Sequence, residues 1–162
     1  MAAGDLTITL TENVELAAAY GGETRAYTNT KTISNIVNTF HRVVKCTNDQ
    51  NTIVASFNSD AHAASGPHLD LEGTKYVRFT NLDGSNDVHI CFKGASDTFS
   101  VTLDPGHSYM MTTPDDYMLA DEDAAGEYPL IAALEDCVEI SLNPTGSAVV
   151  NVEMFAAGIA PA

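Results

Sequence analysis

The stretch from residue 74 to residue 113 constrains the fold most strongly, because three turn signals separate four strand-like runs in it. Val77 and Phe79, for example, alternate with more polar neighbours. Successive side chains of a strand point to opposite faces, so a period of two predicts strands with one dry and one wet face. The turn signals are Asp83-Gly84, Lys93-Gly94 and Pro105-Gly106. Glycine at such steps permits tight reversals, so the stretch is predicted to form an antiparallel meander.

Shorter alternating runs flank this stretch on both sides. The predicted strands are residues 5–11, 39–47, 52–57, 138–142 and 148–154, with a weaker run at 14–19. Loop signals occur at Tyr20-Gly21-Gly22, and a turn is expected near Ser34-Asn35. The pattern predicts an all-β fold of eight or nine short strands with little helix. Such spacing is typical of an antiparallel β-sandwich or a barrel.

Length and charge restrict the organisation and the partners of the chain. Its 162 residues are predicted to form a single β-sandwich domain over residues 1–162. A tail at residues 156–162 is expected either to dock on a partner or to fray. The chain has 22 acidic residues against 7 Lys and Arg, and a net charge of −15. Such a surface repels phosphate, which argues against nucleic acid and anionic membranes as partners.

The cysteines and the N-terminus bear on the compartment. Cys46, Cys91 and Cys137 are odd in number and far apart, which disfavours a disulfide framework and a zinc site. They are predicted to be free thiols buried in the core, as expected for a reducing site of synthesis. The N-terminal residues lack a basic start followed by a long apolar block, so no secretory signal is expected.

Acidic residues are dense in a predicted loop at residues 114–129. Its candidates for an interface are Asp115, Asp116, Asp121, Glu122 and Asp123. Their spacing does not match a calcium-binding EF-hand, so the loop is interpreted as solvated or as facing a basic patch on a partner. Asn81, Asp83, Ser85 and Asp87 occupy every second position, and turn chemistry explains them better than calcium binding.

Catalytic and metal-binding patterns are weak. The segment 103–107 (LDPGH) is similar to the second motif of metal-binding cupins. If their strands are neighbours in a sheet, His89 and His107 are expected to approach one another. The preceding His-x-His element with its glutamate is missing, as is a Gly-x-Ser-x-Gly nucleophile elbow. We therefore predict no catalytic residue, no cofactor and no metal ligand.

Three stretches together carry a family resemblance: residues 76–83 (YVRFTNLD), 88–92 (VHICF) and 99–106 (FSVTLDPG), with a closing strand at 148–155. In this arrangement the chain resembles small virion proteins of tailed bacteriophages. The resemblance implies a jelly-roll-like sandwich that decorates or cements a capsid by bridging capsomers, often as a trimer. It implies the major capsid protein as partner, no cofactor, synthesis in the host cytoplasm and a place on the capsid surface.

The sequence is also compatible with functions other than capsid decoration. Some proteins of this kind are tail or head–tail components, and a glycan-binding or calcium-binding β-sandwich module is a further reading. Tyr76, Arg78 and His89 are predicted to face outward and to form an interface patch, because Tyr and Arg are frequent at binding hot spots. An ordinary exposed strand face is the simpler interpretation. Edge strands at residues 6–10 or 149–155 are expected to add to a neighbour's sheet.

Overall fold

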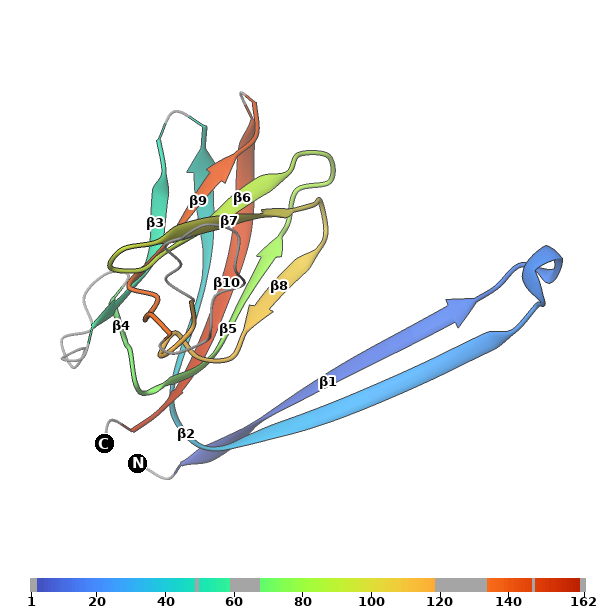
Figure 1. Cartoon of the computed structure of the whole chain (residues 1–162), viewed down its shortest axis with the longest axis horizontal. Helices are drawn as coiled ribbons and strands as arrows, with labels where there is room; N and C mark the ends of the chain where they lie inside the picture. The colour runs from blue at the N-terminus through green and yellow to red at the C-terminus, as the bar shows by residue number, and fades with distance from the viewer. Residues whose placement is uncertain (1–2, 49, 59–67, 119–133, 147, 161–162) are drawn as a thin grey trace, which may run out of the picture.

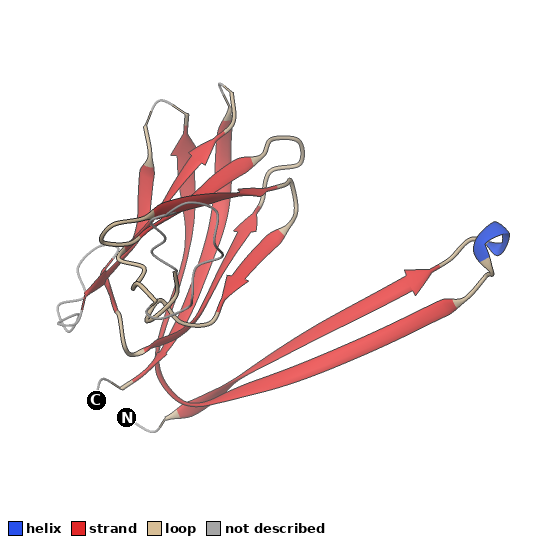
Figure 2. Cartoon of the chain, viewed as in Figure 1, coloured by secondary structure: helices blue, strands red, loops and turns tan. Residues whose placement is uncertain are grey.

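The computed structural model describes residues 3–48, 50–58, 68–118, 134–146 and 148–160, and these residues form two five-stranded sheets (Figure 1). In spatial order, the first sheet contains β1 (Gly4–Glu15), β2 (Thr24–Thr47), β10 (Val149–Ile159), β5 (Thr74–Asn81) and β8 (Ser108–Met111). The second contains β4 (His68–Asp70), β3 (Thr52–Asn58), β9 (Glu139–Pro144), β6 (Val88–Lys93) and β7 (Thr98–Leu103). The predicted all-β sandwich is confirmed, and the described helix is a single 3₁₀ turn, Ala18–Tyr20 (Figure 2).

Strand pairing in the sandwich is nested. β2 pairs with β10, β3 with β9, β5 with β8 and β6 with β7, all antiparallel, and successive pairs alternate between the two sheets. This is the arrangement of a long hairpin rolled up on itself, which is a jelly roll. β1 and β4 are additional edge strands outside the nested scheme.

The predicted meander over residues 74–113 is wrong in its pairing. β5 and β6 lie in different sheets, and so do β7 and β8. Only the turn that begins at Lys93-Gly94 closes a hairpin, while Asp83-Gly84 and Pro105-Gly106 lie in connections between the sheets. Alternation of apolar residues shows which face of a strand is buried, but it does not show which strand lies beside it. Both sheets bury an apolar inner face in the same core, so the same pattern occurs in strands of either sheet.

Turn chemistry explains the polar residues after β5, as predicted. Asn81 is buried, and its amide donates to the carbonyls of Leu103 at 3.1 Å and Asn86 at 2.9 Å. The Asp83 carboxylate accepts hydrogen bonds from the backbone N–H groups of Ser85 and Asn86. Because these bonds favour the charged form, the pKa of Asp83 is lowered. Asn81 therefore ties the connection between the two sheets to the end of β7.

The N-terminal third differs most from the sequence prediction. β1 is one continuous strand that includes residues 14 and 15, the start of the weaker run predicted at 14–19. β2 has 24 residues, so the strands are not uniformly short. The expected turn at Ser34-Asn35 is a bulge inside β2, where the register shifts and Asn35 has a φ of 65°. The loop at Tyr20-Gly21-Gly22 is confirmed, and both glycines adopt positive φ.

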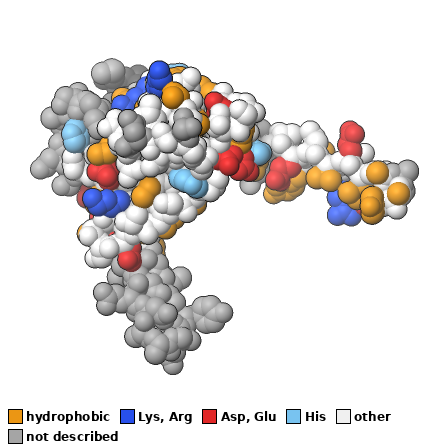
Figure 3. Space-filling model, turned by 90° about the horizontal axis from the view of Figure 1, so that it is seen from above, with side chains coloured by type: hydrophobic (Ala, Val, Ile, Leu, Met, Phe, Trp, Pro, Cys, Tyr) orange, Lys and Arg blue, Asp and Glu red, His pale blue; other side chains and the backbone are white. Residues whose placement is uncertain are grey.

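Beyond this bulge β1 and β2 leave the sandwich as a two-stranded ribbon. We call residues 6–33 the arm. It contains β1 from Leu6, the 3₁₀ turn and β2 up to Ile33, and it projects from the sandwich in two perpendicular views (Figures 1 and 3). The remainder of the described chain is called the body.

The C-terminal strand also corrects two predictions. β10 continues to Ile159, and Ala156 and Ala157 are buried, so most of the expected tail at residues 156–162 is part of a strand. β10 lies between β2 and β5, so residues 149–155 are not an edge strand. The other predicted edge, residues 6–10, does lie in the edge strand β1.

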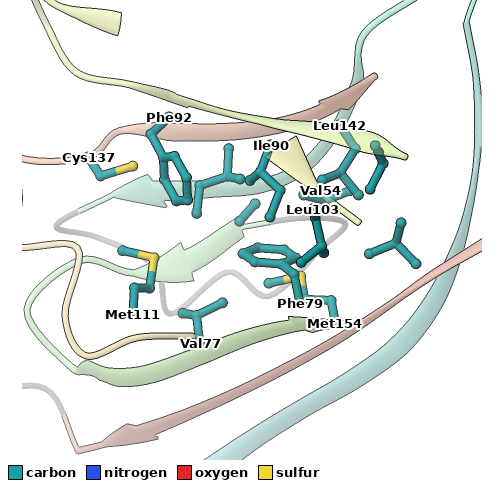
Figure 4. Packing of buried hydrophobic residues seen from close by; sticks show 14 of the residues in the cluster. Val54, Val77, Phe79, Ile90, Phe92, Leu103, Met111, Cys137, Leu142 and Met154 are labelled. Carbon is teal, nitrogen blue, oxygen red and sulfur yellow. The ribbon is translucent and has the colours of Figure 1, made fainter. Parts of the chain in front are cut away.

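The core lies between the two sheets and is almost entirely apolar. Its largest fully buried side chains include Phe79 and Met154 from the first sheet and Ile90, Phe92 and Leu142 from the second (Figure 4). Stacking of Phe92 on Phe99, with ring centroids 4.8 Å apart, extends this core toward the β6–β7 hairpin. The apolar members of the alternating runs in the sandwich thus face inward as predicted, whereas Leu6, Ile8 and Leu10 of the run at residues 5–11 lie outside this core.

The three cysteines are free, as predicted, and Cys46 and Cys137 are buried while Cys91 is half-buried. Burial raises the pKa of the Cys46 thiol to about 11 and that of Cys137 to about 12. A thiol is the nucleophile only when it is ionised, so these two are expected to be inert at neutral pH.

We expect Ellman's reagent to label at most Cys91 in the folded protein at pH 8, and all three cysteines after unfolding. Because folding favours the protonated thiols, their contribution to stability is complete below pH 9 and is lost as the pH rises through the folded pKa values of about 11 and about 12. Rapid native labelling of Cys137, identified by peptide mapping, would contradict this burial.

Candidate interaction surface

The arm is supported by one pair of strands only. Its antiparallel register runs from Leu6 opposite Ile33 to Glu15 opposite Thr24. Pairing of β2 with β10 begins only at Ile36, so among the described residues no third strand pairs with the arm. A two-stranded ribbon is marginally stable in water unless one of its faces is covered. Coverage of one face of the arm by another surface would therefore stabilise it.

One face of the arm is a ladder of threonines. Thr7, Thr9 and Thr11 of β1 lie directly opposite Thr32, Thr30 and Thr28 of β2. The hydroxyl oxygens of Thr9 and Thr30 are 3.4 Å apart, within hydrogen-bonding distance. Threonine favours extended backbone, and cross-strand threonine pairs stabilise a sheet. This threonine face keeps an isolated ribbon extended without adding large apolar side chains.

The opposite face is mostly apolar, and we call it the apolar face of the arm. It contains Leu6, Ile8, Leu10, Glu12 and Val14 of β1, opposite Ile33, Lys31, Asn29, Tyr27 and Arg25 of β2. Toward the tip its side chains are exposed: 46% for Leu10, 49% for Val14 and 61% for Tyr27. Tyr20, in the turn at the tip, is 80% exposed. Figure 3 shows apolar side chains gathered at this end of the arm.

The base of the apolar face lines a pocket of about 510 Å³ between the arm and the body, which we call the crook. The arm contributes Ile8, Leu10, Asn29, Lys31 and Ile33, and the body contributes Lys75, Tyr76, Met110, Met111, Thr112, Thr113 and Asp115. Met110 and Met111 end β8, and Thr112 and Thr113 follow it. The crook therefore lies between the apolar face of the arm and the outer face of the first sheet, beside the C-terminal end of the edge strand β8.

Tyr76, predicted as an exposed interface residue, is buried. It does point away from the sandwich core, as its parity predicts, but it packs with Ile36 and Ala157 in a second apolar cluster. Leu6, Ile8 and Ile33 from the base of the arm cover this cluster. The arm therefore removes Tyr76 from solvent, although the residue still forms part of the wall of the crook.

Arg78 and His89 do not form one patch, because β5 and β6 belong to different sheets. The Arg78 guanidinium is 2.7 Å from the Glu153 carboxylate on β10. The imidazole of His41 on β2 lies 2.8 Å from the other oxygen of the same carboxylate. Glu153 thus links three neighbouring strands on the outer face of the first sheet. His89 is exposed on the second sheet, where its Nδ1 is 3.2 Å from the Thr102 hydroxyl.

His89 and His107 do not assemble a cupin-like site. β6, which carries His89, pairs with β7 and β9, whereas His107 precedes β8 in the other sheet. The Nδ1 of His107 lies 3.7 Å from the carboxylate of Asp104, and both side chains are exposed. The expectation that these two histidines approach each other across neighbouring strands is therefore wrong.

Part of the predicted acidic surface is described. Asp115 lines the crook, and carboxylate oxygens of Asp115, Asp116 and Asp136 lie within 4.8 Å of one another. Desolvation and the two neighbouring carboxylates raise the pKa of Asp115. Asp121, Glu122 and Asp123 lie outside the described residues. That these acidic side chains meet a basic partner stays a prediction.

The arm and the crook were both missed at the sequence level. A usable signal exists: threonine recurs at alternate positions in residues 7–11 and 28–32, on either side of the Gly21-Gly22 turn. Two such runs around a double glycine indicate a hairpin with one threonine face. The crook has no comparable signal, because its lining comes from segments far apart in the sequence.

Comparisons of the chain with protein families, curated proteins and solved structures found no match. No helix among the described residues has the length and apolarity needed to cross a membrane. The geometry of the arm and the crook is therefore the main basis for a functional interpretation.

Arg78→Glu is expected to lower the free energy of unfolding by about 1 kcal/mol, because it places two carboxylates side by side on β5 and β10. The double variant Arg78→Glu/Glu153→Arg should recover part of that loss by reversing the pair. Urea unfolding of both variants measures the difference. An equal loss in the double variant would show that the ion pair contributes nothing.

Asp115→Asn is expected to raise the melting temperature at pH 7. Since folding raises the pKa of Asp115, its charged form destabilises the native state, and this cost grows as the pH rises through the folded pKa. The gain should therefore vanish in acid, where the carboxyl is protonated. Asp5→Asn, at an exposed position in β1, is the matched control for loss of one charge. A gain that is independent of pH would contradict the electrostatic origin.

Proposed function

We propose that this chain is a structural, non-enzymatic virion protein of a tailed bacteriophage that decorates or cements the capsid. The observation that carries the proposal is the arm, a ribbon with an exposed apolar face attached to a stable sandwich. A protein that bridges subunits of a shell needs a rigid body for placement and an extension for contact with neighbours. Both parts are present in one short chain.

The reach of the arm suits such bridging. From Leu6 to Glu15 the ribbon extends for about 30 Å at roughly 3.3 Å per residue. That length is comparable to the diameter of a small domain. One copy placed on a shell could therefore contact an adjacent subunit or an adjacent copy without moving its body.

The fold and the charge support the proposal without being specific to it. Jelly rolls occur in viral capsid proteins, and also in lectins and cupins, so the fold by itself does not assign a function. The resemblance of residues 74–113 to small virion proteins adds the phage context. A net charge of −15 favours solubility at high copy number and disfavours contact with DNA. The proposed partner is the major capsid protein, at the capsid surface.

Mass spectrometry of purified virus particles from the source tests the proposal. A copy number within a few-fold of that of the major capsid protein is expected, because decoration follows the whole lattice. A few copies per particle would instead place the chain in the tail or the head–tail connection. Absence from particles would contradict a virion role, and calorimetry with calcium and a glycan panel would then test the binding-module alternative.

A further inference from the structure

We propose that the outer half of the arm docks in the crook of a second copy of this chain. The inference rests on the proposed assembly function and specifies the partner of the arm. The outer half comprises residues 11–28, with Val14, Tyr20 and Tyr27 as its most prominent apolar side chains. Each copy would then supply one arm and one crook, so copies bind one another through complementary surfaces.

The apolar face of the arm is continuous with the crook. Ile8 and Leu10 line the crook, and Val14 follows them on the same face of β1. Exposure rises along this series, since Ile8 is half-buried while Leu10 and Val14 are 46% and 49% exposed. Across the crook Met110 is 45% exposed. The apolar surface is thus partly covered at the base of the arm and open farther out.

The outer half of the arm cannot fill the crook of its own chain. β1 continues outward from Leu10 as one extended strand to Glu15, so the tip lies well away from the crook (Figure 1). Among the described residues no other segment is free to enter the crook, and the occupant is assigned to another molecule. An exposed apolar ribbon is such an occupant, because it presents an extended backbone to the outer edge of β8 and apolar side chains to Met110 and Tyr76.

Charge favours a second copy as that occupant. The crook is lined by Lys31 and Lys75, two of the chain's 7 basic residues, and by Asp115, whose carboxylate lies close to those of Asp116 and Asp136. The outer half of the arm carries Glu12, Glu15 and Glu23 against Arg25, which is 2.8 Å from Glu23. The carboxylates of a mostly acidic arm can therefore pair with these two lysines on a protein that is otherwise strongly acidic. Elsewhere on this surface, like charge would oppose contact between copies.

Association of the purified protein in the absence of capsid tests the inference. We expect the parent chain to form oligomers in sedimentation equilibrium at micromolar and higher concentrations. Val14→Asp in the arm and Met110→Asp in the crook should each weaken association at least about tenfold, because each places a carboxylate in an apolar contact. Val149→Asp is the matched control, since Val149 is 48% exposed on the body and Val14 is 49% exposed. The control should associate like the parent.

Mixing tests the direction of docking. Val14→Asp chains mixed with Met110→Lys chains should associate more tightly than either variant alone, because the new aspartate can meet the new lysine and the parental arm can enter the parental crook. Circular dichroism and melting curves confirm folding of each variant. If Met110→Asp lowers the melting temperature, Lys75→Glu serves as the second crook variant, since it reverses a charge on the wall of the pocket.

A parent chain that stays monomeric at several hundred micromolar would overturn the inference. Unchanged association of the arm and crook variants, or an equal effect of Val149→Asp, would overturn it as well. The outcome is separable from the proposed function. A chain that is abundant in particles but monomeric in solution retains the virion role and loses arm exchange. A chain that is absent from particles but associates through the arm and the crook retains arm exchange and loses the virion role.

Discussion

The backbone ladder of β2 connects the two parts of this molecule. Its C-terminal half pairs with β10 from Ile36 to Thr47 and so belongs to the first sheet of the sandwich. Its N-terminal half pairs with β1 from Thr24 to Ile33 and forms the arm. The bulge at Asn35 lies between these segments, where the partner of β2 changes. Because one hydrogen-bonded strand passes through both parts, the direction of the arm is set by the sheet of the body.

A second apolar cluster fixes the base of the arm against that sheet. Ile36, Tyr76 and Ala157 are buried in it, and Leu6, Ile8 and Ile33 pack over them. Tyr76 and Phe155 contribute an aromatic contact with ring centroids 6.1 Å apart. Burial of such side chains stabilises the junction by a few kcal/mol each at most, roughly 25 cal/mol per Å² of apolar surface. This packing is what turns the outer face of the sheet into one wall of the crook.

The division of labour between body and arm gives the proposed function its physical basis. The body has a closed core, which contains Cys46, Cys137 and its largest fully buried apolar side chains. The arm has no core of its own, and it exposes Leu10, Val14, Tyr20 and Tyr27 to water. The body exposes apolar side chains as well, such as Val43 and Val149, but the arm presents them on a ribbon with no core of its own, as the proposed assembly role requires. The acidic surface limits that assembly to places where apolar contact and the few lysines outweigh repulsion.

Much of the local structure was determined by the sequence alone. Period-two alternation identified most strands of the body and the inward face of each, and glycine and asparagine marked the main turns, because these are properties of neighbouring residues. The pairing of β5 with β8 and of β6 with β9, the burial of Tyr76 and the separation of Arg78 from His89 came only from the tertiary structure. Alternating strands of similar length can pair in many orders, and the order is decided by how two dry faces pack over a common core. The arm and its crook depend on where β2 leaves β10, and that long-range event has no counterpart in the local pattern.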